Sequence, residues 1–309
     1  MNRRVSASLR LVVWTFAIGA TAWVWWTSAE KSAERPLPDG VMVVRDLTYR
    51  EDAGRRRTLD LYLPVKTGAK PRPAILAIHG GSWVGGSKRE YGPQFARFAQ
   101  HGFVVAVVDY QLARPGEASW NGALDDVAHA VDWLADPART YRIDPQRITT
   151  IGSSAGGLLA AHLARDDLRP LDSSRPGRRI QATVCLSTPT SLAALASNRD
   201  LKHDPVRDLV GDDPLGFHDR AVDASPLSHV APGWRPILLI HGTDDLWVPV
   251  NQAREMRDSC ARLGVSHRLI EIAGARHGFE LQVEAPSRRD LLPEILGFLN
   301  QSDLPVDPR

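Results

Sequence analysis

The chain has 309 residues, of which 43% are hydrophobic, and this is enough to bury one substantial core. Its 38 Lys and Arg side chains nearly cancel its 36 Asp and Glu side chains, and long runs of basic residues that could follow a phosphate backbone are absent. We therefore expect one main domain and no nucleic-acid partner. The basic cluster at residues 55–57 falls between two predicted strands, so we interpret it as a solvated loop.

Residues 1–36 are predicted to be a targeting segment and linker. Three arginines, at positions 3, 4 and 10, precede a mostly apolar, uncharged stretch at residues 11–26. That stretch is short for a spanning helix, which needs about 20 residues, and long for the apolar part of a signal peptide, which has about 7–15. The sequence therefore predicts export, either to the periplasm or exterior after cleavage near residues 27–29, or with residues 11–26 retained as a membrane anchor.

The rest of the chain predicts an α/β domain over residues 37–300, followed by a short tail at 301–309. Residues 41–49 and 58–63 have the pattern of an opening antiparallel hairpin. Nearly continuous apolar runs then alternate with stretches of helical spacing, which is typical of a mostly parallel, doubly wound sheet. Strands are predicted at 74–78, 103–108, 148–151, 180–186, 237–240 and 267–272, and helices at 91–100, 123–134, 156–165, 251–263 and 290–299.

One interval breaks this alternation. About fifty residues separate the strand ending at 186 from the strand starting at 237, and loops of this length inside a domain usually have a functional role. The interval includes residues 191–196 and 205–210 and several Asp, Pro and Gly residues. We interpret residues 188–234 as a small cap over a site at the carboxyl ends of the strands, where ligands bind in such sheets.

The two cysteines do not point to a metal site. Cys185 and Cys260 are far apart, and the sequence contains neither a CxxC motif nor a Cys/His cluster. Cys185 lies in the apolar run 182–186, where a buried thiol is favoured over a disulfide. We expect two free cysteines, no metal and no other cofactor.

A GxSxG pattern at residues 152–156 directly follows the strand predicted at 148–151 and precedes a predicted helix. At a strand-to-helix corner this pattern forces a sharp turn that exposes the serine hydroxyl, and its glycines let neighbouring backbone approach closely. Ser154 is the serine in register, whereas Ser153 is expected to point away. A glycine-rich helix start without function is the alternative, but the flanking strand and helix favour Ser154 as a nucleophile.

The sequence His-Gly-Gly-Ser-Trp at residues 79–83 ends the strand predicted at 74–78. Adjacent glycines leave backbone N–H groups free to donate to a developing oxyanion. We predict an oxyanion hole made by the N–H groups of Gly80, Gly81 and Ala155.

The other side chains of this loop have different predicted roles. His79 is expected to hold the loop rather than to take part in the chemistry. Ser82 and Trp83 are candidate substrate-binding residues. For Trp83, a place in the pocket wall and a place in the core both remain open.

Two later strand ends carry an acid and a histidine. Residues 241–249 include Asp244 and Asp245, and residues 274–279 include His277. An acid that orients a histidine must lie in a loop beside it, which adjacent strand ends allow. The resulting chain order of Ser154, an aspartate and then His277 is the order expected for this fold. His241, which also ends a predicted strand, is the competing histidine, and a solvated turn is the alternative for either aspartate.

Taken together, these motifs resemble the α/β-hydrolase esterases of the hormone-sensitive-lipase and acetyl-esterase group, which includes secreted carbohydrate esterases. The resemblance runs from about residue 41 to residue 299. Residues 79–83 are similar to the family motif HGGGW, 109–112 to DYRL, 152–157 to GxSAGG, 241–249 to HGxxDxxVP and 277–279 to HGF. The register of HGxxDxxVP assigns the acidic position to Asp245. Two residues depart from the pattern, since Ser82 replaces a glycine and Gln111 replaces an arginine.

The resemblance implies an α/β-hydrolase fold and a serine carboxylic-ester hydrolase with Ser154, His277 and Asp245 as its catalytic triad. The predicted export and the compact cap favour short acyl esters, such as acetyl esters, of small molecules or glycans as substrates. Residues 241–279 are in addition similar to prolyl-oligopeptidase-type peptidases, so a serine peptidase or amidase is an alternative. A ligand-binding hydrolase fold without catalysis is a third possibility.

Overall fold

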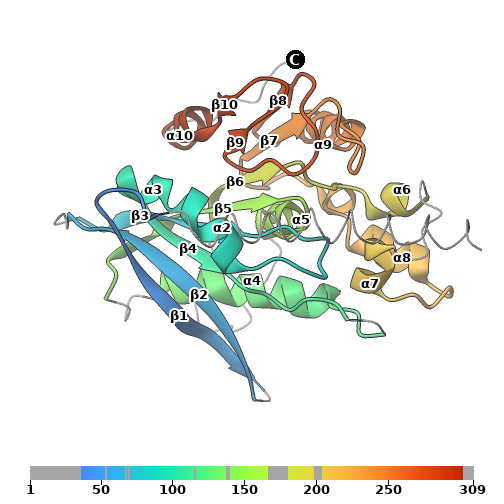
Figure 1. The fold of residues 1–309 in the computed structure, drawn as a ribbon. Helices are drawn as coiled ribbons and strands as arrows, with labels where there is room; N and C mark the ends of the chain where they lie inside the picture. Colours follow the sequence, from blue (N-terminus) through green and yellow to red (C-terminus); the bar gives the residue numbers. More distant parts are fainter. Residues whose placement is uncertain are drawn as a thin grey trace, which may run out of the picture.

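The computed structural model describes residues 36–301 except 53, 67, 69, 115, 137–139, 166–179 and 198–203. Within this part of the chain, eight strands form one sheet in the order β1-β2-β4-β3-β5-β6-β7-β8 (Figure 1). The long hairpin of β1 (Val41–Asp52) and β2 (Arg55–Pro64) is antiparallel, as is the pair β2 and β4. All pairs from β4 to β8 are parallel. The remaining strands of the sheet are β3 (Arg72–Ile78), β4 (Val104–Val108), β5 (Ile143–Ser153), β6 (Ile180–Leu186), β7 (Ile237–Gly242) and β8 (His267–Ile272).

Helices cover both faces of this sheet, and β3 shows how the sequence allows it. Successive side chains of a strand point to opposite faces. Leu76 and Ile78 pack in a core cluster with α4 and α5, whereas Ile75 and Ala77 pack in a second cluster with α2, α3 and α10. Because both faces are buried, the strand is apolar throughout. The helices are α2 (Lys88–Phe95), α3 (Arg97–Gln100), α4 (Trp120–Ala135), α5 (Ala155–Leu163), α9 (Asn251–Arg262) and α10 (Leu292–Leu299).

The predicted mostly parallel sheet with helices on both faces is confirmed. The helix predicted at 91–100 is in fact two helices, α2 and α3, because the hydrogen bonding changes at Ala96: its N–H bonds back to Gly92, but its carbonyl accepts from Ala99 only three residues on. A two-stranded ribbon of β9 (Gln282–Val283) and β10 (Arg289–Asp290) precedes α10 and carries no strand pattern in the sequence.

The interpretation of residues 55–57 as a solvated loop is wrong in part. These arginines begin β2, and although Arg55 and Arg56 are exposed, the side chain of Arg57 is only 17% exposed. Arg57 Nε donates to Asp126 Oδ2 of α4 at 2.7 Å, and Arg50 Nη1 of β1 donates to Oδ1 at 2.9 Å. A carboxylate buried as deeply as Asp126 requires such partners, and it therefore draws both strands of the hairpin onto α4. Asp126 Oδ2 also accepts the backbone N–H of Gln111.

Between β6 and β7, three short helices and a 3₁₀ turn are found in the part of this interval that the structure describes. They are α6 (Leu192–Ser197), α7 (Pro205–Val210), α8 (Phe217–Asp223) and η1 (Pro226–His229). These elements gather at one end of the sheet, on the right in Figure 1. The domain limits at 37–300, 188–234 and 301–309 stay predictions.

The targeting segment predicted at the start of the chain lies outside the described residues, apart from position 36. Among the residues that are described, no helix combines the length and the apolar character needed to span a bilayer.

Candidate active site

Ser154 occupies a sharp corner between β5 and α5. Its backbone has φ 51° and ψ −117°, and a non-glycine residue with positive φ costs about 1–3 kcal/mol. The corner is held by a hydrogen bond from the N–H of Ser154 to the carbonyl of Leu186 on β6, at 2.8 Å. Strain of this kind persists where surrounding structure enforces it, and it is typical of functional sites.

Two glycines explain how backbone packs around this corner. A Cβ on Gly156 would lie 2.2 Å from the carbonyl oxygen of Ile78, so the start of α5 sits directly against the end of β3. A Cβ on Gly80 would lie 2.9 Å from the carbonyl oxygen of Ser153 and 3.4 Å from Cβ of Ser154. The loop after β3 is therefore pressed against the corner, and only glycine allows these approaches. Ala155, the first residue of α5, is buried at the same place.

His277 connects Ser154 to Asp245. His277 Nε2 is 2.9 Å from Ser154 Oγ, and His277 Nδ1 is 2.7 Å from Asp245 Oδ2. A carboxylate accepts, so Nδ1 carries the proton and Nε2 is left to accept from the serine hydroxyl. The three side chains come from positions spread over more than 120 residues of the sequence. Their arrangement is that of a nucleophile, a base and an orienting acid.

Asp245 is fully engaged by its own loop and by two histidines. Its Oδ1 accepts the N–H groups of Trp247 and Val248, at 3.0 and 2.8 Å. Its Oδ2 also lies 3.4 Å from His241 Nε2. Burial alone would raise the pKa of Asp245, but hydrogen bonds from His241 and His277 outweigh it and hold the pKa well below its ordinary value. Asp245 is therefore an anion at neutral pH.

The structure separates the candidates that the sequence left in competition. His241 is buried, and its Nε2 donates to the carbonyl of Val248 at 2.8 Å, whereas it is His277 that lies within hydrogen-bond distance of Ser154. Asp244 is exposed and accepts only from the neighbouring Thr243 hydroxyl, at 3.2 Å, in the hydrogen bonds that the structure gives it. The Ser153 hydroxyl donates to the carbonyl of Phe279 at 3.4 Å, and it is Ser154 that lies within hydrogen-bond distance of His277.

The loop after β3 combines several residues with positive φ. Gly81 has φ 125°, and the two non-glycine residues that follow, Ser82 and Trp83, have φ 54° and 63°. Ser82 thus keeps a backbone conformation suited to the glycine that it replaces. His79 anchors the start of the loop: it is buried, stacks on Tyr110 at 4.4 Å between ring centroids, and donates from Nδ1 to the carbonyl of Gly80.

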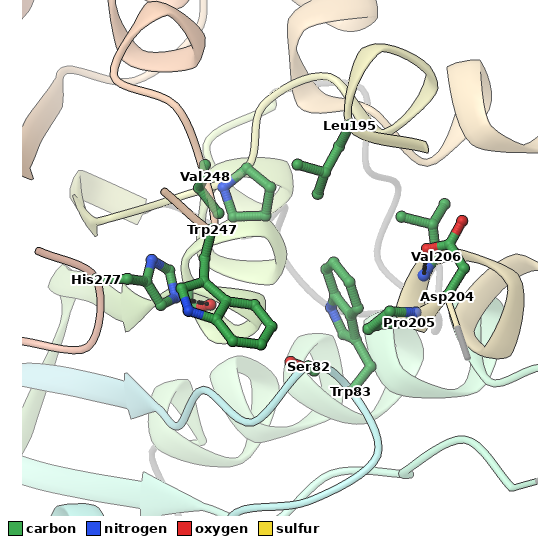
Figure 2. Close-up of a pocket in the computed structure, with 11 residues that line it drawn as sticks. Ser82, Trp83, Leu195, Asp204, Pro205, Val206, Trp247, Val248 and His277 are labelled. Atoms are coloured by element: carbon green, nitrogen blue, oxygen red, sulfur yellow. Dashed lines mark hydrogen bonds between the residues drawn. The ribbon is translucent and has the colours of Figure 1, made fainter. Parts of the chain in front are cut away.

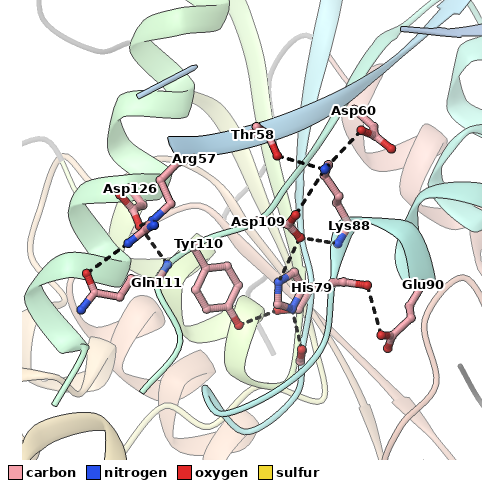
Figure 3. Close-up of polar contacts among 12 residues, drawn as sticks. Arg57, Thr58, Asp60, His79, Lys88, Glu90, Asp109, Tyr110, Gln111 and Asp126 are labelled. Atoms are coloured by element: carbon pink, nitrogen blue, oxygen red, sulfur yellow. Dashed lines mark hydrogen bonds and ion pairs between the residues drawn. The ribbon is translucent and has the colours of Figure 1, made fainter. Parts of the chain in front are cut away.

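A buried ammonium group ties the far end of this loop to the sheet (Figure 3). The side chain of Lys88 is 3% exposed, and its Nζ lies 2.6 Å from Asp46, 3.5 Å from Asp60 and 3.3 Å from Asp109. The N–H of Lys88 also donates to Asp109 Oδ1 at 2.7 Å, and the same oxygen lies 4.0 Å from His79 Nε2. The start and the end of the loop are therefore linked through one carboxylate.

A small cavity of about 30 Å³ opens onto Ser154 and His277 (Figure 2). Trp83 is 3% exposed, belongs to the core and also lines this cavity, so both roles considered for it hold. Ser82 lines it as well. The remaining walls are Pro189, Leu195, Asp204, Pro205, Val206, Trp247 and Val248.

Several of these wall residues were not anticipated. Leu195 and Asp204 come from the segment between β6 and β7 and carry no local motif. Trp247 lies two residues after Asp245, so its place next to a predicted acid was the one signal that could have identified it. His241 was considered only as a competing base, whereas the structure makes it a second neighbour of Asp245.

Comparisons with known proteins show that the chain is similar to esterases. The chain is 28% identical to the esterase LipC of Mycobacterium tuberculosis, over 87% of this chain and 71% of LipC. It is 26% identical to the probable isoprenylcysteine alpha-carbonyl methylesterase ICMEL1 of Arabidopsis thaliana, over 82% of this chain but only 56% of that protein.

A solved esterase, Est2 of Thermogutta terrifontis with bound propionate, superposes with a TM-score of 0.63 at 27% identity. The match covers 78% of this chain and 86% of Est2. Est2 has also been solved phosphorylated by paraoxon. The BD-FAE family matches residues 59–259, which is more than half of the chain. The chain therefore belongs to the BD-FAE family and has the α/β-hydrolase fold of esterases.

Proposed function

We propose that this protein is a serine carboxylic-ester hydrolase in which Ser154 is the nucleophile, His277 the base and Asp245 the acid that orients the base. The observation that carries this proposal is the continuous row of hydrogen bonds from Asp245 to His277 to Ser154, at 2.7 and 2.9 Å. The relatives named esterases support the reaction class. Paraoxon phosphorylation of Est2 supports a reactive site of the same kind here.

The proposed cycle has two halves. His277 Nε2 accepts the proton of Ser154 as the hydroxyl attacks the ester carbonyl, while the charge of Asp245 stabilises the imidazolium. The imidazolium then protonates the departing alcohol, which leaves an acyl-enzyme. Water activated by the same nitrogen releases the acid and restores the serine. Base assistance of this kind contributes about 10²–10⁴-fold to the rate.

The N–H groups of Gly80, Gly81 and Ala155 are proposed to bind the oxyanion. The close approach of Gly80 to Ser153 and Ser154 supports this assignment, because it brings the loop next to the reacting oxygen. Each donor is worth about 10²–10³ in kcat. His79, Asp109 and Lys88 are expected to hold this loop in place.

A short acyl group is the proposed substrate portion for the small cavity. A cavity must offer about 10–15 Å³ to hold one water molecule, so about 30 Å³ between Trp83 and Ser154 suits an acetyl group better than a long chain. Acetyl esters of small molecules or glycans are therefore the first substrates to test.

Kinetics of Ser154→Ala test the proposal. The variant should lower kcat for a nitrophenyl acetate by about 10⁶, while the circular dichroism spectrum and melting temperature stay close to those of the parent. Ser153→Ala, on the neighbouring hydroxyl, is the matched control and should retain most of the activity. Activity that survives in Ser154→Ala would remove the proposed nucleophile. An acetyl ester should also be cleaved much faster than the matched acetanilide, and the reverse order would favour an amidase.

We further propose that the protein is exported, either released after cleavage or held at a membrane by residues 11–26. The basic residues at positions 3, 4 and 10 before that apolar stretch support this. Fractionation of cells that produce the full chain, with esterase activity measured in each fraction, tests it. Activity confined to the cytoplasm would contradict export.

A further inference from the structure

A larger cavity of about 320 Å³ adjoins the small cavity at Ser154. It lies between the loop after β7, helix α6 and the start of α9. Leu195 and Trp247 line both cavities, so the two spaces are neighbours with these two side chains as shared walls. The outer cavity is lined by Ala194, Leu195, Leu246, Trp247, Pro249, Asn251, Gln252 and Glu255.

Two large apolar side chains are exposed at this outer cavity. Leu246 is 87% exposed and Trp247 is 56% exposed, although both follow directly after the buried Asp245. The N–H of Trp247 donates to Asp245 Oδ1 at 3.0 Å, which fixes the backbone from which the indole projects. Contiguous apolar surface beside a polar rim marks a binding site more often than single exposed residues do.

The floor of the outer cavity is already ordered. Gln252 is buried, and its Oε1 accepts the N–H groups of Thr190 and Ser191, each at 2.7 Å. Its Nε2 donates to the carbonyl of Ser191 at 3.1 Å. These bonds join α9 to the chain that leaves β6, so this side of the site needs little rearrangement before it binds a ligand.

The position of His277 decides which part of an ester occupies which cavity. The leaving oxygen must come within hydrogen-bond reach of Nε2, because that nitrogen returns the proton. Trp247 and His277 line the same cavity, and in the view of Figure 2 Pro205 and Val206 appear on the other side of Trp83 from them. An alcohol held near Nε2 then lies on the Trp247 side of the cavity, and the acyl group lies on the Trp83 side.

We propose that Trp247, together with Leu246, forms a leaving-group site that binds the ring of a cyclic alcohol. This inference rests on the proposed ester hydrolysis and adds to it a substrate class: a short acyl group on a ring-bearing alcohol. The two cavities differ in size in the same sense, since the cavity at Ser154 has about 30 Å³ for the acyl group and the outer cavity has about 320 Å³ for the alcohol. An aromatic face contributes through burial of apolar area and stacking.

Methyl acetate and cyclohexyl acetate separate this effect from the rest of catalysis. Both esters give the same acetyl-enzyme, and neither alcohol is activated, so any difference between them arises before the alcohol has left. The measured quantity is the ratio of kcat/KM for cyclohexyl acetate to kcat/KM for methyl acetate, obtained by titrating the released acid. Trp247→Ala should lower this ratio about tenfold, the low end of what a pocket contact contributes to discrimination.

Three further variants make the test specific. Trp247→Phe should keep most of the parent's ratio of kcat/KM values, since it keeps an aromatic face. Leu246→Ala, which changes only the outer cavity, should lower the ratio by a smaller factor. Leu215→Ala removes another exposed side chain, 83% exposed and lining neither cavity, and should leave both the ratio and the activity unchanged.

An unchanged ratio in Trp247→Ala would overturn the leaving-group site. The same conclusion follows if activity on both esters falls in proportion, because Trp247 would then act only through Asp245. Neither outcome contradicts the proposal that the protein hydrolyses esters, which would be contradicted if Ser154→Ala kept its activity.

Discussion

The two flanks of Ser154 are held in place by different means. On one flank, side-chain contacts position the residues. His277 is positioned by a hydrogen bond to Asp245, and Asp245 is fixed in turn by two backbone N–H groups and His241. On the other flank, backbone packing positions the loop after β3. Gly80 is packed against the corner, and the residues after it hold positive φ.

We therefore expect mutations on the two flanks to have different effects on activity and stability. Loss of a side chain on the acid–base flank removes chemistry but leaves packing almost unchanged. On the loop flank, any added or removed group displaces backbone, so both activity and stability should respond. The predictions below test this contrast, in order of decreasing expected effect on rate.

Asp245→Asn should have the largest effect on the acid–base flank, with kcat lowered by about 10⁴, because an amide leaves His277 in the wrong tautomer. The pKa of Asp245 is held below its ordinary value of 3.8, so the parent carboxylate stays ionised as the pH falls toward that value. The loss should therefore be measured at neutral pH, where the parent carboxylate is ionised. A loss of less than about tenfold in kcat there would contradict the role of Asp245.

Gly80→Ala tests the loop flank. The added methyl group would lie 2.8 Å from Tyr91 Oη and 2.9 Å from the carbonyl of Ser153, so the loop must move. A shift of about 1 Å can cost about 10² in rate, and we expect kcat/KM to fall by about that factor. Gly297→Ala in α10 is the control, since its added methyl group meets nothing within 4 Å. Equal activities for the two variants would mean that the loop is not tightly held.

Lys88→Met should have the smallest effect on rate, about tenfold in kcat, together with a loss of about 3 kcal/mol in the free energy of unfolding. Removing one partner of a buried ion pair destabilises the fold, and here the fully buried Asp60 would keep Arg45 as its one remaining cation in the ion pairs of the described residues. Arg89→Met is the matched control, because Arg89 also bonds Asp46 but is 59% exposed. Exposed pairs are worth less than about 1 kcal/mol. Urea unfolding of both variants checks this, and similar losses would contradict a special role for Lys88.

The parts of the site that could be predicted from sequence are those with local physical requirements. Ser154 was identifiable because a nucleophile at a strand-to-helix corner needs glycines around it, and Asp245 and His277 because both follow apolar strand patterns. The choice between Asp245 and Asp244 came from family resemblance, not from the residues alone.

Other features depend on contacts between distant segments and leave no local pattern. Lys88 has the appearance of a surface lysine in the sequence, and it is buried only because Asp46, Asp60 and Asp109 converge on it from three strands or strand ends. Arg57 was misjudged for the same reason, since its partner Asp126 lies 69 positions away. The pocket residues Leu195 and Asp204 depend on how the short helices after β6 fold back onto the sheet.

Covalent labelling of Ser154 tests the central claim most directly. The full chain is treated with a fluorophosphonate, digested, and the modified peptide is sequenced by mass spectrometry. One phosphonyl group per chain is predicted, on Ser154, and its rate of attachment should drop sharply in His277→Ala. Attachment at another residue, or an unmodified Ser154 in folded protein that still hydrolyses esters, would contradict the proposed nucleophile.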